Sequence, residues 1–124
     1  MFERLLGERR IRVMEGTLPD GWWGAYDLHF NTIILRPRLA PLQKRSTLAH
    51  ECAHAVLGHH GHHARQEREA EELAASWLIG HHDFHMAARI HDTVQAVAHE
   101  LNVLPRDVKA YARALGRAQK RRTP

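Results

Sequence analysis

Apolar residues recur every three or four positions along much of the second half of the chain, which is the spacing of an amphipathic helix. The clearest stretch predicts a helix over residues 66–79 that stops at Gly80. Its apolar stripe consists of Ala70, Leu73, Ala74, Trp77 and Leu78. Two shorter helices are predicted further along, the first capped by Asp92 and the second opened by Pro105.

Another helix is predicted between the loop that follows Pro41 and the glycine at position 58. Ser46 or Thr47 would cap its first turn through a hydroxyl oxygen, and Gly58 would end it in the left-handed conformation. Apolar side chains line one side of this helix: Leu48, Cys52, Val56 and Leu57. That side is expected to pack on the core and to leave the opposite side free for chemistry.

The first third of the chain instead contains short runs typical of strands. Residues 11–15 predict one strand, and residues 25–28 and 32–35 predict a hairpin around a short connection. Pro37 and Pro41 are expected to end the second hairpin strand and to begin a loop. Strands followed by helices indicate an α+β fold, with a small antiparallel sheet beside the helical half.

Composition and charge narrow the class of protein. Of the 124 residues, 44% are apolar and 26% charged, which is typical of a globular chain with one core. The longest apolar runs, 32–35 and 74–80, are far shorter than the roughly 20 residues of a membrane span, and residues 2–5 open no apolar signal region. The single cysteine, Cys52, cannot build a disulfide framework and is expected in the core. We expect a cytoplasmic protein without a membrane partner.

The formal net charge of +4 comes largely from two terminal basic clusters, residues 9–12 and 117–122. Basic clusters attract nucleic acid. Residues 95–115 also have the spacing of a helix-turn-helix, in which Asn102 would take the left-handed turn position. DNA binding is therefore one hypothesis. The favoured interpretation is that these two helices pack on the rest of the domain, because a lone helix pair lacks a core of its own.

Eleven of the twelve histidines lie between His50 and His99, and one group of them has the spacing of metal ligands. Residues 50–54 read His-Glu-Cys-Ala-His. Positions four apart share a helix face, so both imidazoles can reach one zinc ion at about 2.0–2.1 Å. Glu51 lies about 100° around the helix and can accept a proton from a water at the metal. The motif predicts a zinc site with His50 and His54 as ligands and Glu51 as the catalytic base.

A catalytic zinc site usually has three protein ligands and one open position. The acidic start of the next predicted helix offers several glutamates. Glu69 is the predicted third ligand, because it lies one and two turns before Leu73 and Trp77 and so borders the apolar stripe. Glu71 and Glu72 are expected to point toward solvent.

Two alternatives for the third ligand stay open. Glu67 lies in the same acidic run. His60 stands where a longer HExxH pattern has a third histidine, although that pattern needs glycine at position 57, where this chain has Leu57. The histidines of residues 59–63 can also hold a metal ion at the surface, and a solvated loop explains them equally well.

Three stretches resemble the ImmA/IrrE family of metallopeptidases: residues 31–37 (Asn-Thr-Ile-Ile-Leu-Arg-Pro), residues 47–59 around the motif, and residues 67–75 (Glu-Arg-Glu-Ala-Glu-Glu-Leu-Ala-Ala). The likeness runs from about residue 24 to residue 115. The chain departs from the family pattern at Glu71, where Asn or Asp is usual, and at Leu73, where Phe is usual. The resemblance implies a zinc-dependent fold with a small sheet beside the metal helix. It also implies that the ligands are His50, His54 and Glu69 and that the base is Glu51.

The resemblance further implies an activity. Members of this family typically cleave a helix-turn-helix repressor in phages, mobile elements or stress responses, so we expect a zinc endopeptidase with such a repressor as its partner. The alternative is a zinc-containing regulator that binds DNA or protein through residues 95–115. An extended substrate is expected to pair with an edge strand beside the metal helix, for which residues 32–35 are the best candidate.

A single metallopeptidase domain is expected over residues 1–124. Its parts are N-terminal strands (1–45), metal-binding helices (46–80), C-terminal helices (81–116) and a basic tail (117–124).

Overall fold

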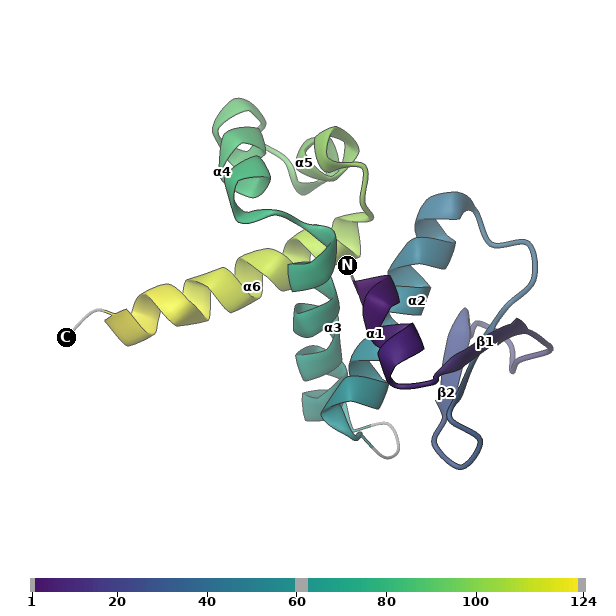
Figure 1. Cartoon of the computed structure of the whole chain (residues 1–124). Coiled ribbons are helices and arrows are strands. Elements are labelled where there is room, and N and C mark those ends of the chain that lie inside the picture. Colours follow the sequence, from purple (N-terminus) through teal and green to yellow (C-terminus); the bar gives the residue numbers. More distant parts are fainter. Residues whose placement is uncertain (1, 60–62, 123–124) are drawn as a thin grey trace.

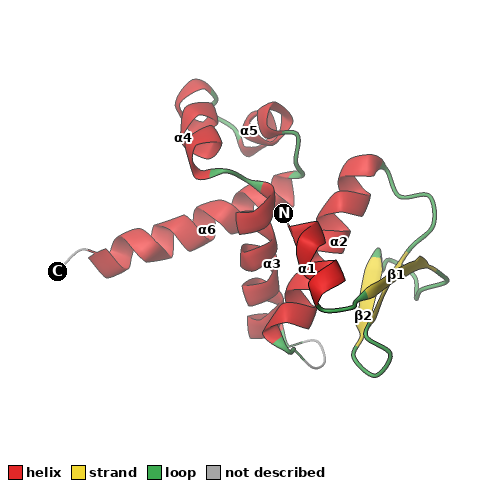
Figure 2. Ribbon diagram, viewed as in Figure 1, coloured by secondary structure: helices red, strands yellow, loops and turns green. Residues whose placement is uncertain are grey.

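The computed structural model describes residues 2–59 and 63–122, and it has an α+β fold, as predicted (Figure 1). The elements in chain order are α1 (Phe2–Glu8), β1 (Arg12–Glu15), β2 (Gly24–Asp27), β3 (Thr32–Leu35), α2 (Pro41–Leu57), α3 (Ala64–Leu78), α4 (His81–Ile90), α5 (Val94–Leu101) and α6 (Pro105–Arg122). Figure 2 shows the strands grouped at one end of the molecule and the helices at the other. Among the described residues, no helix is long and apolar enough to cross a membrane.

The three strands form one sheet in the order β1-β3-β2. The predicted hairpin is confirmed, because β2 and β3 pair antiparallel. The expectation of a wholly antiparallel sheet is wrong, because β1 pairs parallel to β3. The strand of residues 32–35 is therefore the central strand with a partner on each side, and it is not an edge. The central position agrees with its sequence, because this strand is an apolar run and the most buried of the three strands.

The core lies between this sheet and the first three helices. Ile33 and Leu35 of the central strand are almost fully buried, as is Cys52 of α2, which confirms the cysteine as a core residue. Helix α1 closes the core from outside, where the ring of Phe2 stacks on that of Trp77 at 5.9 Å between centroids. Helix α2 therefore packs on α3 on one side and on the sheet on the other.

Helix α2 begins earlier than predicted, at Pro41 rather than after Ser46 or Thr47. Proline suits the first helical position because its missing N–H has no partner there in any case. The backbone N–H of Ala40, just before the helix, donates to Gln43 Oε1 at 3.0 Å and so caps the first turn. Ser46 and Thr47 lie in the buried interior of the helix. Their hydroxyl groups are therefore available for contacts with another element.

The C-terminal half contains one more helix than the apolar pattern revealed, α4, together with the two predicted ones. The cap of α5 is Thr93 and not Asp92, because Thr93 Oγ1 accepts the N–H of Ala96 at 3.1 Å. Asn102 has the left-handed conformation that was predicted, with φ of 57°. Helices α4 and α5 share a second apolar cluster with the start of α6. Helix α6 then packs across α3 and extends beyond it toward the C-terminus (Figure 1). The favoured interpretation, in which these helices pack on the domain, is confirmed.

Candidate metal centre

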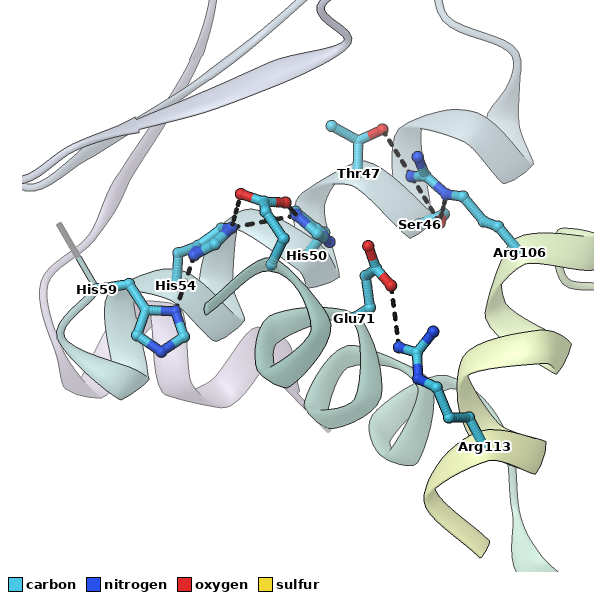
Figure 3. Close-up of polar contacts among 9 residues, drawn as sticks. Ser46, Thr47, His50, His54, His59, Glu71, Arg106 and Arg113 are labelled. Atoms are coloured by element: carbon cyan, nitrogen blue, oxygen red, sulfur yellow. Dashed lines mark hydrogen bonds and ion pairs between the residues drawn. The ribbon is translucent and has the colours of Figure 1, made fainter. Parts of the chain in front are cut away.

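Two histidines of α2 and one glutamate of α3 bring three ligand atoms together between the helices. His50 Nε2 and His54 Nε2 lie 3.2 Å apart, one turn from each other on the same face of α2 (Figure 3). Glu67 approaches from the first turn of α3, with Oε2 at 3.0 Å from His50 Nε2 and Oε1 at 3.0 Å from His54 Nε2. Within the described part of the chain, these three residues are the one group of three or more such side chains whose geometry suits a metal ion.

The structure places Glu67 at the histidines, and Glu69 does not reach them. Glu69 is 48% exposed and lies 3.8 Å from Arg65 on the outer surface of α3. The apolar stripe of α3 has two flanks, and the two glutamates border different ones. Glu69 lies one and two turns before Leu73 and Trp77, and Trp77 stacks on Phe2 of α1. Glu67 instead reaches the two histidines of α2. The other alternative, His60, lies outside the described residues.

The donor set fits a zinc ion. A tetrahedral ion with bonds of about 2.0–2.1 Å has ligand atoms about 3.3 Å apart. The two Nε2 atoms lie 3.2 Å apart, and each lies 3.0 Å from a different oxygen of the Glu67 carboxylate, Oε2 for His50 and Oε1 for His54. With one ligand atom taken from each residue, the three atoms lie within 4.8 Å of one another. Two imidazoles and one carboxylate form a His-His-Glu set, which is a known combination for catalytic zinc with one position left for water or substrate.

The two histidines differ in their protonation. Burial and the neighbouring His50 lower the pKa of His54 to about 4, so its imidazole is neutral near pH 7 and in the form that binds metals. Burial also acts to lower the pKa of His50, but the hydrogen bond that its imidazole donates to Glu67 and the charge of Glu51 outweigh burial, so that pKa is raised. Glu67 therefore favours the charged form of the His50 imidazole, and a metal ion at the same atoms would compete with that proton.

A fourth residue, His59, contacts His54 at the ring nitrogen that does not face Glu67. Its Nδ1 lies 3.1 Å from Nδ1 of His54 (Figure 3). The left-handed Gly58 ends α2 and turns the chain back, which brings His59 alongside the helix it has just left. A ligand histidine is commonly oriented by a partner on its second ring nitrogen. The sequence had suggested His59 only as part of a surface cluster, since nothing in a linear pattern shows which loop histidine folds back. Of that cluster, His60 and His62 lie outside the described residues.

Glu51 follows His50 and borders the same space. A cavity of about 620 Å³ is lined by Trp22, Gly24, Ala25, Tyr26, His50, Glu51, His54, His59 and Glu67. The ligand atoms and the carboxylate of the predicted base therefore open into one cleft. The other wall of this cleft is β2, whose residues 24–26 appear in its lining.

The strand beside the metal group is thus β2, which pairs only with β3 among the described residues. The expectation that residues 32–35 form the substrate-pairing edge is wrong for this reason. The free edge of β2 presents backbone N–H and C=O groups at the cleft, and such an edge can pair with an extended peptide.

Helix α6 reaches the same region from the other side. The guanidinium of Arg106 donates to Ser46 Oγ from Nε at 3.1 Å and from Nη2 at 2.9 Å (Figure 3). The Ser46 hydroxyl donates in turn to Asp107 Oδ1 at 3.1 Å. The first turn of α6 is therefore bound to the metal helix. In a helix-turn-helix the start of the second helix contacts base edges, so these contacts occupy the part of α6 that the DNA-binding hypothesis needs.

Glu71 and Glu72, the last two acidic residues of α3, form ion pairs with α6. Arg113 lies 3.0 Å from Glu71 and 2.6 Å from Glu72, and Arg117 forms a further ion pair with Glu72. The side chain of Glu72 is only 10% exposed. The expectation that these glutamates point toward solvent is wrong for Glu72, because the basic segment of α6 covers it. Part of the predicted basic tail is thereby neutralised against α3.

The fold and the donor set define the class: an α+β domain with a candidate metal centre between its two central helices. The chain matches the model of the IrrE N-terminal-like domain, peptidase family M78, over residues 9–109, and it belongs to that family. The resemblance found in the sequence is thereby confirmed, and the family indicates a metallopeptidase role. No curated protein matches the chain.

Proposed function

We propose that the chain is a zinc-dependent endopeptidase of the cytoplasm, with His50, His54 and Glu67 as ligands and Glu51 as the general base. The observation that supports this proposal most strongly is the convergence of two imidazoles and one carboxylate, whose ligand atoms lie within 4.8 Å of one another, in a cleft that Glu51 also lines. A purely structural zinc site is normally closed by four protein ligands. An open cleft with a carboxylate beside the ligands favours catalysis.

The residues of the site would have different roles in peptide hydrolysis. When bound, zinc would lower the pKa of a water to about 7 and polarise the carbonyl to be cleaved. Glu51 then accepts the proton of the attacking water and returns it to the leaving nitrogen. His59 keeps the His54 ring in place. These roles require no residue from outside the two helices and the loop between them.

The substrate would be an extended peptide paired with the edge of β2. Backbone hydrogen bonds to β2 hold a peptide in register with little demand on its sequence. Selectivity must therefore come from contacts beyond the strand. We propose that the partner is a helix-turn-helix repressor, as the family resemblance implies, and that the helices after Gly80 contribute to its recognition.

The test uses the zinc-loaded chain and the helix-turn-helix protein encoded by its genetic neighbour. We expect one cut in the repressor and almost none in unfolded casein, with mass spectrometry locating the cut. A matched sample of Glu51→Gln should bind the same amount of zinc and leave the repressor intact. Equal cleavage by both proteins would show a contaminating protease. Tight DNA binding by the isolated chain with no cleavage would instead favour the regulator hypothesis.

A further inference from the structure

A second cavity adjoins the cleft at His50 and Glu51, and Glu67 of α3 does not line it. It has a volume of about 200 Å³ and is lined by Gly21, Trp23, Gly24, Thr47, His50, Glu51 and Arg106. Three of these residues, Gly24, His50 and Glu51, also line the larger cavity. The cleft therefore continues past the candidate base, beyond the first residue of β2, and ends at the start of α6.

Arg106 is held rigidly at this end. Its Nε and Nη2 donate to Ser46 Oγ, and Nη2 also lies 3.5 Å from Thr47 Oγ1. The guanidinium carbon lies 4.7 Å from the centre of the Trp23 ring. Two protein elements thus fix the plane of the guanidinium, and a fixed plane is what paired recognition of a carboxylate requires.

Part of this guanidinium is not used by the fold. Among the described residues, its hydrogen bonds come from Nε and Nη2, whereas Nη1 donates to none of them. The neighbouring Asp107 carboxylate interacts with it through charge, but no carboxylate there forms a direct ion pair with it. The neighbouring arginines of α6 differ in this respect, because Arg113 and Arg117 are paired with glutamates of α3. Arg106 is also the one cationic residue among those that line the small cavity, apart from a histidine in the metal group.

We propose that Arg106 and this cavity form a subsite that binds a carboxylate of the peptide substrate. The inference rests on the proposed peptidase function and adds a preference at one substrate position. A peptide paired with the edge of β2 would pass Gly24 and Glu51 and then enter the small cavity. A volume of about 200 Å³ is below the roughly 300–1,000 Å³ of small-molecule sites, so it suits a single side chain or chain end.

The carboxylate can belong to a glutamate or aspartate side chain or to the C-terminus of the peptide. Both present two oxygens that a guanidinium can bind. The two sources differ in position along the peptide, which allows an experiment to separate them. Peptides of neutral sequence with both ends capped carry neither group, so each source can be added alone.

The test measures binding rather than cleavage, in the zinc-loaded full chain with Glu51→Gln to prevent turnover. The probes are capped octapeptides in which one glutamate moves through a neutral sequence, each matched by a peptide with glutamine at that place, and a neutral peptide with a free C-terminus. Calorimetry should find one glutamate register, or the free acid, that binds about ten-fold more tightly than its neutral match, as one charge-assisted hydrogen bond provides. Arg106→Gln should reduce that preference to about two-fold or less.

Lys109→Gln is the matched control, since it removes one positive charge from the same helix at a residue that lines neither cavity. It should keep the preference, and all variants should hold the same amount of zinc. Equal binding of charged and neutral peptides, no binding of either, or a preference that survives Arg106→Gln overturns the subsite. Failure of the proposed function gives a different result. A chain that prefers the charged peptide but does not cut the repressor would have the subsite without the peptidase activity.

Discussion

Gly24 and Thr47 lie so close together that a Cβ atom added to Gly24 would be 2.5 Å from Thr47 Cγ2. The same atom would lie 3.3 Å from Glu51 Cγ. The first residue of β2 can therefore approach α2 only because it has no side chain. This approach places the free edge of the sheet directly beside the candidate base.

Gly24→Ala is expected to destabilise the protein and to lower peptidase activity. The new methyl group would push β2 away from α2, and overpacking of this kind typically costs about 1–3 kcal/mol. Chemical denaturation measures the loss in the free energy of unfolding. Adding Thr47→Ser removes the closest methyl group and should restore part of that loss.

Gly116→Ala provides the control for this substitution. Gly116 lies within α6, and a Cβ atom there would meet nothing within 4 Å. Alanine favours a helix over glycine by up to about 1 kcal/mol, so this variant should be as stable as the parent or more stable. If Gly24→Ala behaves in the same way, the close packing of β2 on α2 is not required for the fold.

The ligand set predicts a clear order of zinc contents. Purified protein should hold about one tightly bound zinc per chain, the number expected for one catalytic site. Glu67→Gln, like His50→Ala or His54→Ala, should lose most of it, because each removes one of three ligand atoms. Glu69→Gln should keep it, since Glu69 lies on the outer surface of α3.

Elemental analysis after dialysis against a weak chelator measures these contents, and Glu69→Gln is the matched control for Glu67→Gln. Full zinc in Glu67→Gln combined with loss in Glu69→Gln would restore the assignment made from the sequence. Loss in His60→Ala alone would identify that histidine as the third ligand. Zinc above one per chain that disappears on mutation of the histidines at 59–63 would report a separate surface site.

Most of the secondary structure could be predicted from local patterns, because the strands and α2, α3, α5 and α6 each have a regular apolar spacing. Helix α4 was missed because Met86 and Ile90 are exposed, so its apolar residues do not mark one buried face. The sheet order could not be predicted for another reason. Parallel pairing of β1 with β3 joins strands that are far apart in sequence, and the choice between edges depends on the packing of the whole core.

The site shows the same division between local and tertiary information. His50, Glu51 and His54 form a local pattern whose geometry follows from the turn of a helix. The third acidic residue depends on how α3 is rotated against α2. Glu67 and Glu69 border opposite flanks of one apolar stripe, and the sequence does not say which flank faces the histidines. The small, fully buried Ala70 was the better guide, since helices that approach closely place small residues at the contact.

Glu72 should make the free energy of unfolding depend on pH in the acidic range. Burial acts to raise its pKa, but hydrogen bonds from Arg117 and Arg113 outweigh burial and lower the pKa below its ordinary value of 4.5. The charged form therefore stabilises the fold above that ordinary value, and this contribution is lost as the pH falls through the lowered pKa. Glu72→Gln should reduce the free energy of unfolding by about 1–3 kcal/mol near neutral pH.

The measurement is the difference in unfolding free energy between parent and variant at about pH 7 and at about pH 3. We expect that difference to shrink at the lower pH. Glu71→Gln is the control: its side chain is 40% exposed and contacts Arg113 alone of these two arginines, so its effect should be smaller at both pH values. A difference that stays constant with pH would mean that Glu72 acts through packing and not through charge.

His59 should set the strength of zinc binding without being a ligand. Its Nδ1 lies 3.1 Å from Nδ1 of His54, whereas the atoms that face the metal site belong to His50, His54 and Glu67. Loss of such an orienting partner typically weakens metal binding by roughly 10–100-fold. We therefore expect His59→Ala to bind zinc at one per chain with that reduction in affinity, measured by competition with a chromogenic chelator. His63→Ala, an exposed histidine just before α3, should leave the affinity unchanged. Complete loss of zinc in His59→Ala, equal to the loss in His54→Ala, would show that His59 binds the metal directly.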